Sequence, residues 1–82
     1  MPILVPHAEL AASLGAETFL SHARTVAELL EEVGQGMDPE TWKKSIQCTL
    51  LLNGRNIHYL NGFSTTLDPD DVIWMVVPSG GG

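Results

Sequence analysis

The chain has 82 residues, and its 44% hydrophobic and 17% charged residues are typical of one small folded domain. Ten acidic and four basic side chains give a net charge of -6, which argues against binding to nucleic acids or to anionic membrane surfaces. A single cysteine excludes an internal disulfide. The sequence shows neither a secretory signal nor an apolar run of membrane-spanning length, so we expect a soluble cytoplasmic domain.

The N-terminal segment predicts two short strands separated by a short helix. Residues 2–5 form a brief apolar run, closed by Pro6, whose length suits a strand. Residues 8–14 are rich in alanine and leucine and favour a helix that Gly15 ends. Residues 17–20 are expected to form the second short strand.

The main helix is predicted to begin after Thr25. Thr25 and Glu28 have the spacing of a capping box, in which each side chain satisfies a free backbone N–H group. Apolar residues then recur at helical spacing on one stripe, which comprises Val26, Leu29, Leu30 and Val33. Gly34 and Gly36 are expected to end the helix, and residues 34–44 to form a loop with one further helical turn.

The rest of the chain predicts strands joined by tight turns. Ser45–Leu52 is expected to form a strand, followed by a turn at Asn53-Gly54, where both residues tolerate positive φ. Ile57–Tyr59 suits a short returning strand. Val72–Val77 is apolar on both faces, which is typical of a central buried strand, so Val76→Asp is expected to unfold the domain. One sheet covered by one amphipathic helix is the expected α+β architecture.

The body of the chain carries no pattern typical of catalysis or of metal binding. His7, His22 and His58 lack the spacing of metal ligands. Asp68–Asp71 is shorter than a calcium-binding loop and predicts a solvated turn. Cys48 lies on the apolar face of a predicted strand, which favours core packing over a reactive thiol. We therefore expect no metal and no bound cofactor.

The last four residues, 79–82, read Ser-Gly-Gly-Gly and have two interpretations. The glycines are either an incidental end or a slim thread that enters a partner's active site, because glycine adopts backbone angles closed to other residues. Residues 78–82 extend about 17 Å when fully stretched. A carboxylate is a poor electrophile, so a reactive tail has to be joined to a leaving group such as AMP before sulfur or an amine attacks it.

Residues 52–72, LNGRNIHYLNGFSTTLDPDDV, resemble the ThiS/MoaD family of ubiquitin-like sulfur carriers. Members of that family carry an Asn-Gly turn, a Gly-x-x-Thr-x-Leu segment and an acidic turn before a hydrophobic strand, then prolines and a terminal Gly-Gly. The start of the main helix, from Thr25 to Leu30, is similar to the family's helix start, and residues 7–15 lie where members have a short helix ending in glycine. The ordered set, with Gly81-Gly82, covers most of the chain.

The resemblance implies a ubiquitin-like β-grasp fold, a mixed sheet packed on one main helix, with residues 1–78 as the domain and residues 79–82 as a protruding tail. It implies that a ubiquitin-activating-type enzyme uses ATP to adenylate Gly82, and that a sulfurtransferase or other sulfur donor converts the adenylate to a thiocarboxylate. Gly80 and Gly81 would thread the partners' active sites. A sulfur-accepting biosynthetic enzyme would receive the sulfur, and the chain would be a protein co-substrate or the small subunit of an enzyme complex.

The pathway and the fate of the tail stay open at this point. Molybdopterin synthesis is the first expectation, with sulfur supply to cysteine, thiazole or a secondary metabolite as alternatives. A protein modifier joined to lysines through the same tail begins with the same adenylation, and an interaction domain with incidental glycines is a third interpretation. For partner docking the sequence points to Phe63, which suits the core equally well, and more weakly to Asp70 and Asp71.

Overall fold

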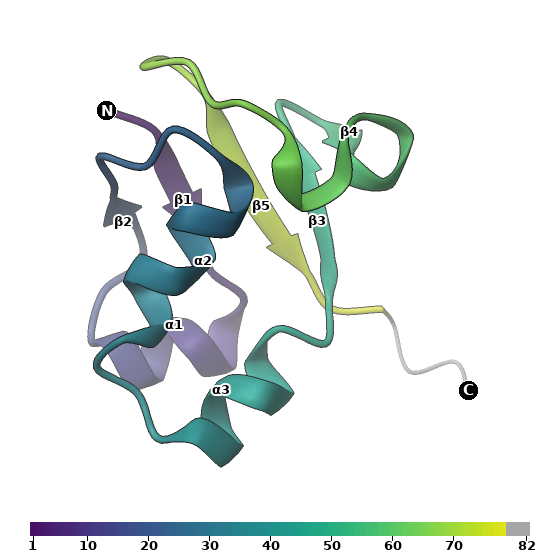
Figure 1. The fold of residues 1–82 in the computed structure, drawn as a ribbon. Coiled ribbons are helices and arrows are strands. Elements are labelled where there is room, and N and C mark those ends of the chain that lie inside the picture. The colour runs from purple at the N-terminus through teal and green to yellow at the C-terminus, as the bar shows by residue number, and fades with distance from the viewer. Residues whose placement is uncertain (79–82) are drawn as a thin grey trace.

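The computed structural model describes residues 1–78, which form a five-stranded sheet crossed on one face by the main helix (Figure 1). The strands are β1 (Ile3–Val5), β2 (Phe19–Leu20), β3 (Thr49–Leu52), β4 (Arg55–Asn56) and β5 (Val72–Val76), and their order across the sheet is β2-β1-β5-β3-β4. β1 and β5 are parallel and the other neighbouring pairs are antiparallel. The sheet is therefore mixed, and the last strand of the chain lies at its centre, as predicted.

Three helices and two 3-10 turns connect the strands: α1 (Ala8–Leu14), α2 (Val26–Gly34), α3 (Pro39–Ser45), η1 (Ile57–Tyr59) and η2 (Gly62–Ser64). α1 ends at Gly15, whose φ of 71° confirms the predicted glycine stop. α3 is the further helical turn expected in the loop, and it begins at Asp38, whose carboxylate accepts a hydrogen bond from the Thr41 N–H. No helix within residues 1–78 combines the length and the apolar character needed to cross a membrane.

The start of α2 carries the predicted hydroxyl cap and a displaced carboxylate cap. Thr25 Oγ1 accepts a hydrogen bond from the Glu28 N–H at 3.2 Å, as a capping box requires. The Glu28 carboxylate accepts from the Arg24 N–H, one residue before the predicted position. The chain entering α2 is extended and bridged to Thr66, which brings the Arg24 N–H within reach of the carboxylate.

The hydrophobic core lies between α2 and the inner face of the sheet. Val26, Leu29 and Val33 are buried, and Leu30 packs against the core as a partly buried residue, so the predicted helical stripe is confirmed. The same cluster includes Leu4, Leu10, Leu50, Leu52, Ile57, Leu67, Ile73 and Met75. Burial of this apolar area is the main stabilisation available to so small a domain.

Only one face of the central strand is buried, so the prediction of burial on both faces is wrong. Ile73 is 0% and Met75 5% exposed, whereas Trp74 is 48% and Val76 42% exposed. α2 covers the inner face, and the period of two along a strand places alternate apolar residues on the other face. The expectation that Val76→Asp unfolds the domain is corrected for the same reason.

β3 is shorter than the predicted strand, Ser45–Leu52, and begins at Thr49. Ser45 closes α3 instead, and its Oγ donates a hydrogen bond to the Thr41 carbonyl at 2.8 Å. The Ile46 N–H continues the helical pattern by donating to the Trp42 carbonyl. The helix that begins after Asp38 thus includes Ser45, although the alternating polarity that starts at this residue predicted a strand.

The predicted returning strand at Ile57–Tyr59 is also wrong. β4 comprises only Arg55 and Asn56, and η1 follows directly. Asn56 causes the change, because its Oδ1 accepts a hydrogen bond from the His58 N–H at 2.8 Å and caps a 3-10 turn. The chain consequently leaves the sheet after two paired residues, as Figure 1 shows.

The turn at Asn53-Gly54 is confirmed, with φ values of 51° and 88°. Asn53 also binds the start of β5: its Nδ2 donates to Asp71 Oδ1 at 2.8 Å, and its Oδ1 accepts from the Val72 N–H at 3.0 Å. The second Asp71 carboxylate oxygen accepts from the Asp68 N–H at 2.7 Å. The acidic turn is therefore exposed, as predicted, and also ordered by side-chain hydrogen bonds.

Candidate functional site

The C-terminal end of β5 is the point from which the chain continues toward the predicted tail. β5 ends at Val76, which pairs with Thr49 of β3, and the exposed residues Val77 and Pro78 follow. Gly80, Gly81 and Gly82, predicted to thread partner sites and to carry the thiocarboxylate, lie outside the described residues. The surface around Pro78 is therefore the part of the predicted site that the structure defines.

An exposed apolar strip follows the outer face of β5 to Pro78. We call Trp74 and Val76 of this face, together with Val77 just beyond the strand, the outer strip; they are 48%, 42% and 54% exposed. Across the sheet Trp74 pairs with Val5 of β1 and Leu51 of β3, which are half-buried and widen the apolar surface. A contiguous exposed apolar surface on a small domain is typical of a site that binds another protein.

Phe63 lies on η2 and is 59% exposed, which removes the interpretation of Phe63 as a core residue. It flanks a groove of about 250 Å³ between β3 and the two 3-10 turns. We call this hollow the β3 groove; its lining includes Ile46, Cys48, Leu50, Ile57, His58 and Phe63. Because Leu50 and Ile57 belong to the core, the groove opens on the helix-bearing side of the sheet and is separate from the outer strip.

Cys48 forms part of the wall of the β3 groove. It is half-buried and packs against the edge of the core, which agrees in part with the predicted core position. Burial raises the pKa of its thiol. The nucleophilic thiolate is therefore scarce at neutral pH, and Cys48 serves as an apolar wall rather than as a reactive group.

Asp70 and Asp71 lie at the other end of β5 from Pro78. They precede Val72, the first residue of a five-residue strand, and such a strand is about 16 Å long. Asp71 holds the turn together, whereas Asp70 is exposed. Their docking role stays a prediction, and it requires a partner that spans the length of β5 to reach both the turn and the tail.

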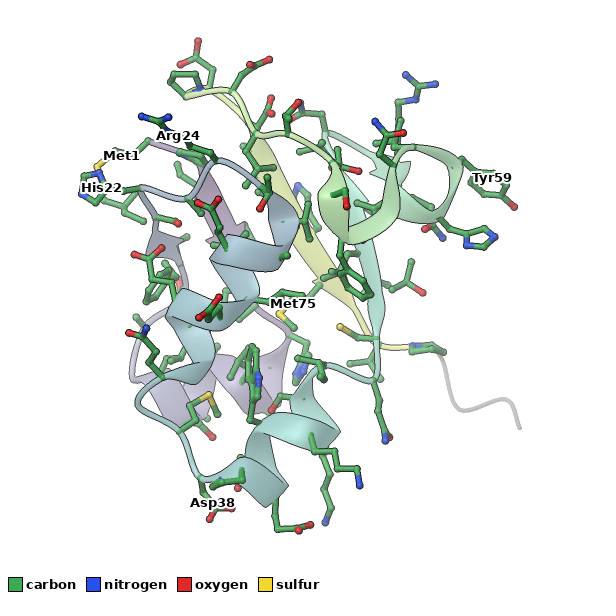
Figure 2. The ribbon with its side chains drawn as sticks, viewed as in Figure 1. Met1, His22, Arg24, Asp38, Tyr59 and Met75 are labelled. Atoms are coloured by element: carbon green, nitrogen blue, oxygen red, sulfur yellow. The ribbon has the colours of Figure 1, made fainter. Side chains whose placement is uncertain are left out.

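A second hollow, of about 520 Å³, lies at the pole of the domain that holds the N-terminus. Its lining includes Met1, His22, Arg24, Leu67 and Pro69. Figure 2 shows Met1, His22 and Arg24 together at this pole, away from the end of β5. No carboxylate or thiol lines the hollow, and the Ser21 hydroxyl in its lining donates a hydrogen bond to the Glu32 carboxylate and accepts one from the Ala23 N–H.

The histidines are dispersed, and one of them has a structural role. His7 Nδ1 accepts a hydrogen bond from the Leu10 N–H at 3.3 Å, and its Nε2 lies 3.0 Å from the Ser45 carbonyl oxygen. This imidazole therefore caps α1 and ties it to the end of α3. Within residues 1–78, no three histidine, cysteine or acidic side chains gather as a metal site.

Sequence reasoning missed the outer strip because it placed the whole of Val72–Val77 in the core. The exposure of Trp74 and Val76 could have been predicted from the number of amphipathic helices in the sequence. A single amphipathic helix covers one face of a sheet, so a central strand with apolar residues at every position has to expose half of them.

The arrangement of the elements matches solved structures along nearly the whole chain. Small archaeal modifier protein 1 (SAMP1) from Methanosarcina acetivorans matches with a TM-score of 0.80 and 22% identity, over 99% of this chain and 95% of that one. A chain of the Amycolatopsis orientalis BexX/CysO complex matches with a TM-score of 0.80 and 13% identity over 100% of both chains. Urm1 from Sulfolobus solfataricus matches with a TM-score of 0.70 and 12% identity, over 94% of this chain and 100% of that one.

These likenesses and the central position of β5 define the class of the domain as ubiquitin-like β-grasp. The sequence profile of the ThiS family matches residues 6–82, and the chain belongs to that family. The resemblance noted along the sequence is thereby confirmed. None of the curated proteins compared with this chain matches it.

Proposed function

We propose that the chain is a sulfur carrier whose Gly82 carboxylate is adenylated by a ubiquitin-activating-type enzyme and then converted to a thiocarboxylate. Membership of the ThiS family carries the proposal, because the family match runs through Gly82. The carboxylate oxygen attacks the α-phosphate of ATP and pyrophosphate leaves. A sulfur nucleophile from a sulfurtransferase or another donor then displaces AMP. Hydrosulfide gives the thiocarboxylate directly, whereas a persulfide gives an acyl disulfide, which a thiol cleaves to release the thiocarboxylate and form a disulfide. ATP is bound by the activating partner, and the carrier itself needs no cofactor.

The outer strip supports this proposal, because the folded domain has to bind the partner enzyme before the tail can react in the partner's active site. Glycines offer little apolar area, whereas Trp74 is an aromatic anchor of the kind that dominates binding energy at protein interfaces. The strip continues directly to Pro78, so a partner bound there would hold the beginning of the tail against its own surface. Phe63 has the exposure that docking requires, and its role there stays a prediction.

Sulfur from the carrier is proposed to pass to a biosynthetic enzyme. Molybdopterin synthesis is the first pathway that we propose, and cysteine, thiazole and secondary-metabolite synthesis are the alternatives. The BexX/CysO complex supports a carrier that works in association with a partner protein. Removing the gene from its host and determining which of these products is no longer made distinguishes the pathways.

A second candidate function is conjugation to other proteins. The likeness to small archaeal modifier protein 1, with a TM-score of 0.80, favours it. In this case the same Gly82 adenylate would be attacked by a lysine amine, AMP would leave, and an isopeptide bond would form. The domain and the docking surface serve both functions equally.

Intact-mass measurement of the protein from its native cells tests the proposal. A sulfur carrier gains the mass difference between one sulfur and one oxygen at its C-terminal residue, and a modifier appears in covalent adducts with other proteins. The matched control is the same chain lacking Gly82, which should show neither change. If the wild-type chain stays unmodified in cells that need the sulfur-containing product, the sulfur-carrier and modifier functions both fail. The interaction-domain interpretation then replaces them.

A further inference from the structure

The sheet ends at β2 on the side opposite to β4, and one side of β2 has no strand beside it. Within residues 1–78, β2 pairs only with β1, where Leu20 lies opposite Ile3. The Ser21 N–H extends this pairing by donating to the Pro2 carbonyl at 3.0 Å. Figure 1 shows no helix or strand beyond β2 on its other side. We call this open side of Phe19–Ser21 the β2 edge.

Leu20 is the residue whose backbone groups point toward the β2 edge. Residues of an antiparallel pair alternate between those that exchange hydrogen bonds with the partner strand and those that direct their N–H and C=O away from it. Ser21 bonds to β1, and Phe19, two positions earlier, faces β1 in the same way. Leu20 lies between them, and Ile3 opposite it donates its own N–H to the Asp71 carbonyl instead. The Leu20 N–H and C=O therefore form a template for another extended chain.

The outer side of the β2 edge is apolar. Leu4 faces the core, so Ile3 beside it, and with it Leu20, lies on the outer face of the sheet. The Leu20 side chain is 57% exposed and continues a row formed by Ile3 and by Val72 of β5, which are half-buried. A strand added beside Leu20 would place every second side chain on this row.

The helix side of the β2 edge is acidic. The Glu32 carboxylate of α2 accepts a hydrogen bond from the Ser21 hydroxyl, which places it directly over the end of β2. Glu28, one helical turn earlier, accepts from the Arg24 N–H at 3.2 Å, so both carboxylates face the chain that leaves β2. Residues 15–35 contain one arginine and four glutamates, which are Glu17, Glu28, Glu31 and Glu32.

These carboxylates decide what kind of chain fits the β2 edge. A second copy would pair one acidic chain with another, each of net charge -6, and like charges across an interface oppose association. A strand added to the sheet lies about 4.8 Å from β2, and the long stem of a lysine or arginine on it spans that gap toward Glu32. A strand with cationic side chains on the helix side and apolar ones on the outer side matches both faces.

We propose that the β2 edge binds an extended segment of a partner protein in which apolar side chains alternate with lysine or arginine. The segment's backbone pairs with the Leu20 N–H and C=O, its apolar side chains extend the row of Leu20 and Ile3, and its cations face Glu28 and Glu32. Backbone pairing combined with recognition of alternate side chains is how sheet edges bind extended peptides. The site uses neither Gly82 nor the outer strip, so it stands or falls independently of the sulfur chemistry.

Hydrogen exchange of the full chain tests the open edge first. Because the Leu20 N–H points away from β1, it should exchange at least about tenfold faster than the Phe19 and Ser21 amides, which pair with β1. A Leu20 amide as protected as its neighbours would show that the edge is covered, and the proposal fails. Repeating the measurement after dilution or after removal of residues 79–82 identifies a second copy or the tail as the cover.

A short capped peptide in which valines alternate with lysines then tests binding. Titrated into the isotope-labelled full chain, it should give saturable NMR shifts centred on Phe19, Leu20 and Ser21, and it should slow exchange of the Leu20 amide. Three altered peptides should each bind at least about tenfold more weakly. They carry glutamates in place of the lysines, methylated backbone nitrogens, or the same residues with the lysines grouped at one end.

Two substitutions of Leu20 separate backbone pairing from side-chain contact. Leu20→Pro removes the outward N–H and leaves the bonds of β2 to β1 in place, so it should weaken peptide binding by at least about tenfold. Leu20→Ala keeps the donor and loses only apolar area, so its effect should be smaller. Trp74→Ala, on the outer strip, should leave peptide binding unchanged. A melting curve checks that each variant folds, and the N-methylated peptide tests the pairing without any variant.

Three outcomes of the titration would overturn the proposal. One is the absence of saturable shifts up to millimolar peptide. Another is equal binding of the N-methylated or the glutamate peptide, which would remove the backbone pairing or the role of the acidic side. The third is a set of shifts centred on Trp74 and Val76, which would place the peptide on the outer strip instead.

Discussion

The two faces of β5 have nearly the same composition and opposite roles. On the inner face, Ile73 and Met75 are buried beneath α2, and on the outer face, Trp74 and Val76 are exposed to solvent. The side chains are equally apolar, so their chemistry does not decide which are buried. The number of layers in the domain does, because one helical layer covers one face. The exposed apolar face is left available for a partner at the strand that continues into the tail.

The largest expected effect comes from placing a carboxylate on each face in turn. Met75→Asp should unfold the domain, because an unpaired buried charge costs about 3–5 kcal/mol or more, a large share of a small domain's stability. Val76→Asp should cost below about 1 kcal/mol, because its carboxylate remains in water. Thermal or urea unfolding of the two variants gives the comparison. Equal destabilisation by both would show that the outer face is covered.

The second expected effect separates docking from folding on the outer face. Trp74→Ala should leave the melting temperature nearly unchanged and weaken binding to the activating enzyme by at least about tenfold, the loss typical of an aromatic interface anchor. Leu20→Ala is the matched control, since Leu20 is 57% exposed on β2 at the edge of the sheet. Titration calorimetry with the activating enzyme measures the binding of the two variants, and a melting curve measures their stability. If the two substitutions weaken binding alike, Trp74 has no special role.

Local signals in the sequence predicted most of the fold. Gly15 ends α1, Thr25 caps α2 and Asn53-Gly54 turns the hairpin, because each of these residues satisfies a backbone requirement within a few positions of itself. The central position of the last strand also followed from its apolar run. These features depend on neighbours in the chain, which a sequence displays directly.

The errors arose where a capping side chain or a missing layer decided between alternatives. Ile57–Tyr59 has the composition of a strand, but the Asn56 side chain caps a 3-10 turn there. Ser45 alternates with strand-like residues, but its hydroxyl closes α3 on Thr41. Predicting the outer strip would have required knowing that the layers formed by residues 1–78 leave Trp74 and Val76 exposed. The predicted docking residue Phe63 was found exposed.

A smaller effect tests how β5 is held at its start, opposite the tail. Asn53→Ala should cost about 1–2 kcal/mol, because it removes the side-chain hydrogen bonds to Asp71 and to Val72, the first residue of β5, and places a less tolerant residue at positive φ. Asp70→Ala should change stability by less than about 0.5 kcal/mol, as expected for an exposed turn residue. Urea unfolding compares them. A neutral Asn53→Ala would show that the network does not anchor the strand.

The smallest effect is a shift in the pH dependence of Cys48. Burial raises the pKa of its thiol, so alkylation in the folded chain should reach half its maximal rate at a higher pH than in the urea-unfolded chain. By linkage, the folded state favours the neutral thiol: this stabilisation is complete below the unfolded pKa and is lost as pH rises through the folded one. Identical pH profiles in the folded and unfolded chains would contradict a half-buried thiol.

The most direct test of the central claim is sulfur loading of a chain that lacks Gly82. The variant is mixed with ATP, the activating enzyme and a sulfur donor, and its intact mass and melting temperature are compared with those of the wild type and of Ser79→Gly, a tail variant that keeps all 82 residues. The melting temperature should be unchanged, since residues 1–78 contain the core. Sulfur loading and delivery should be lost, because the reacting carboxylate is displaced by about 3.4 Å and even about 1 Å costs roughly 100-fold in rate. A shortened chain that loads and delivers sulfur at the normal rate would contradict the assignment of Gly82 as the working terminus.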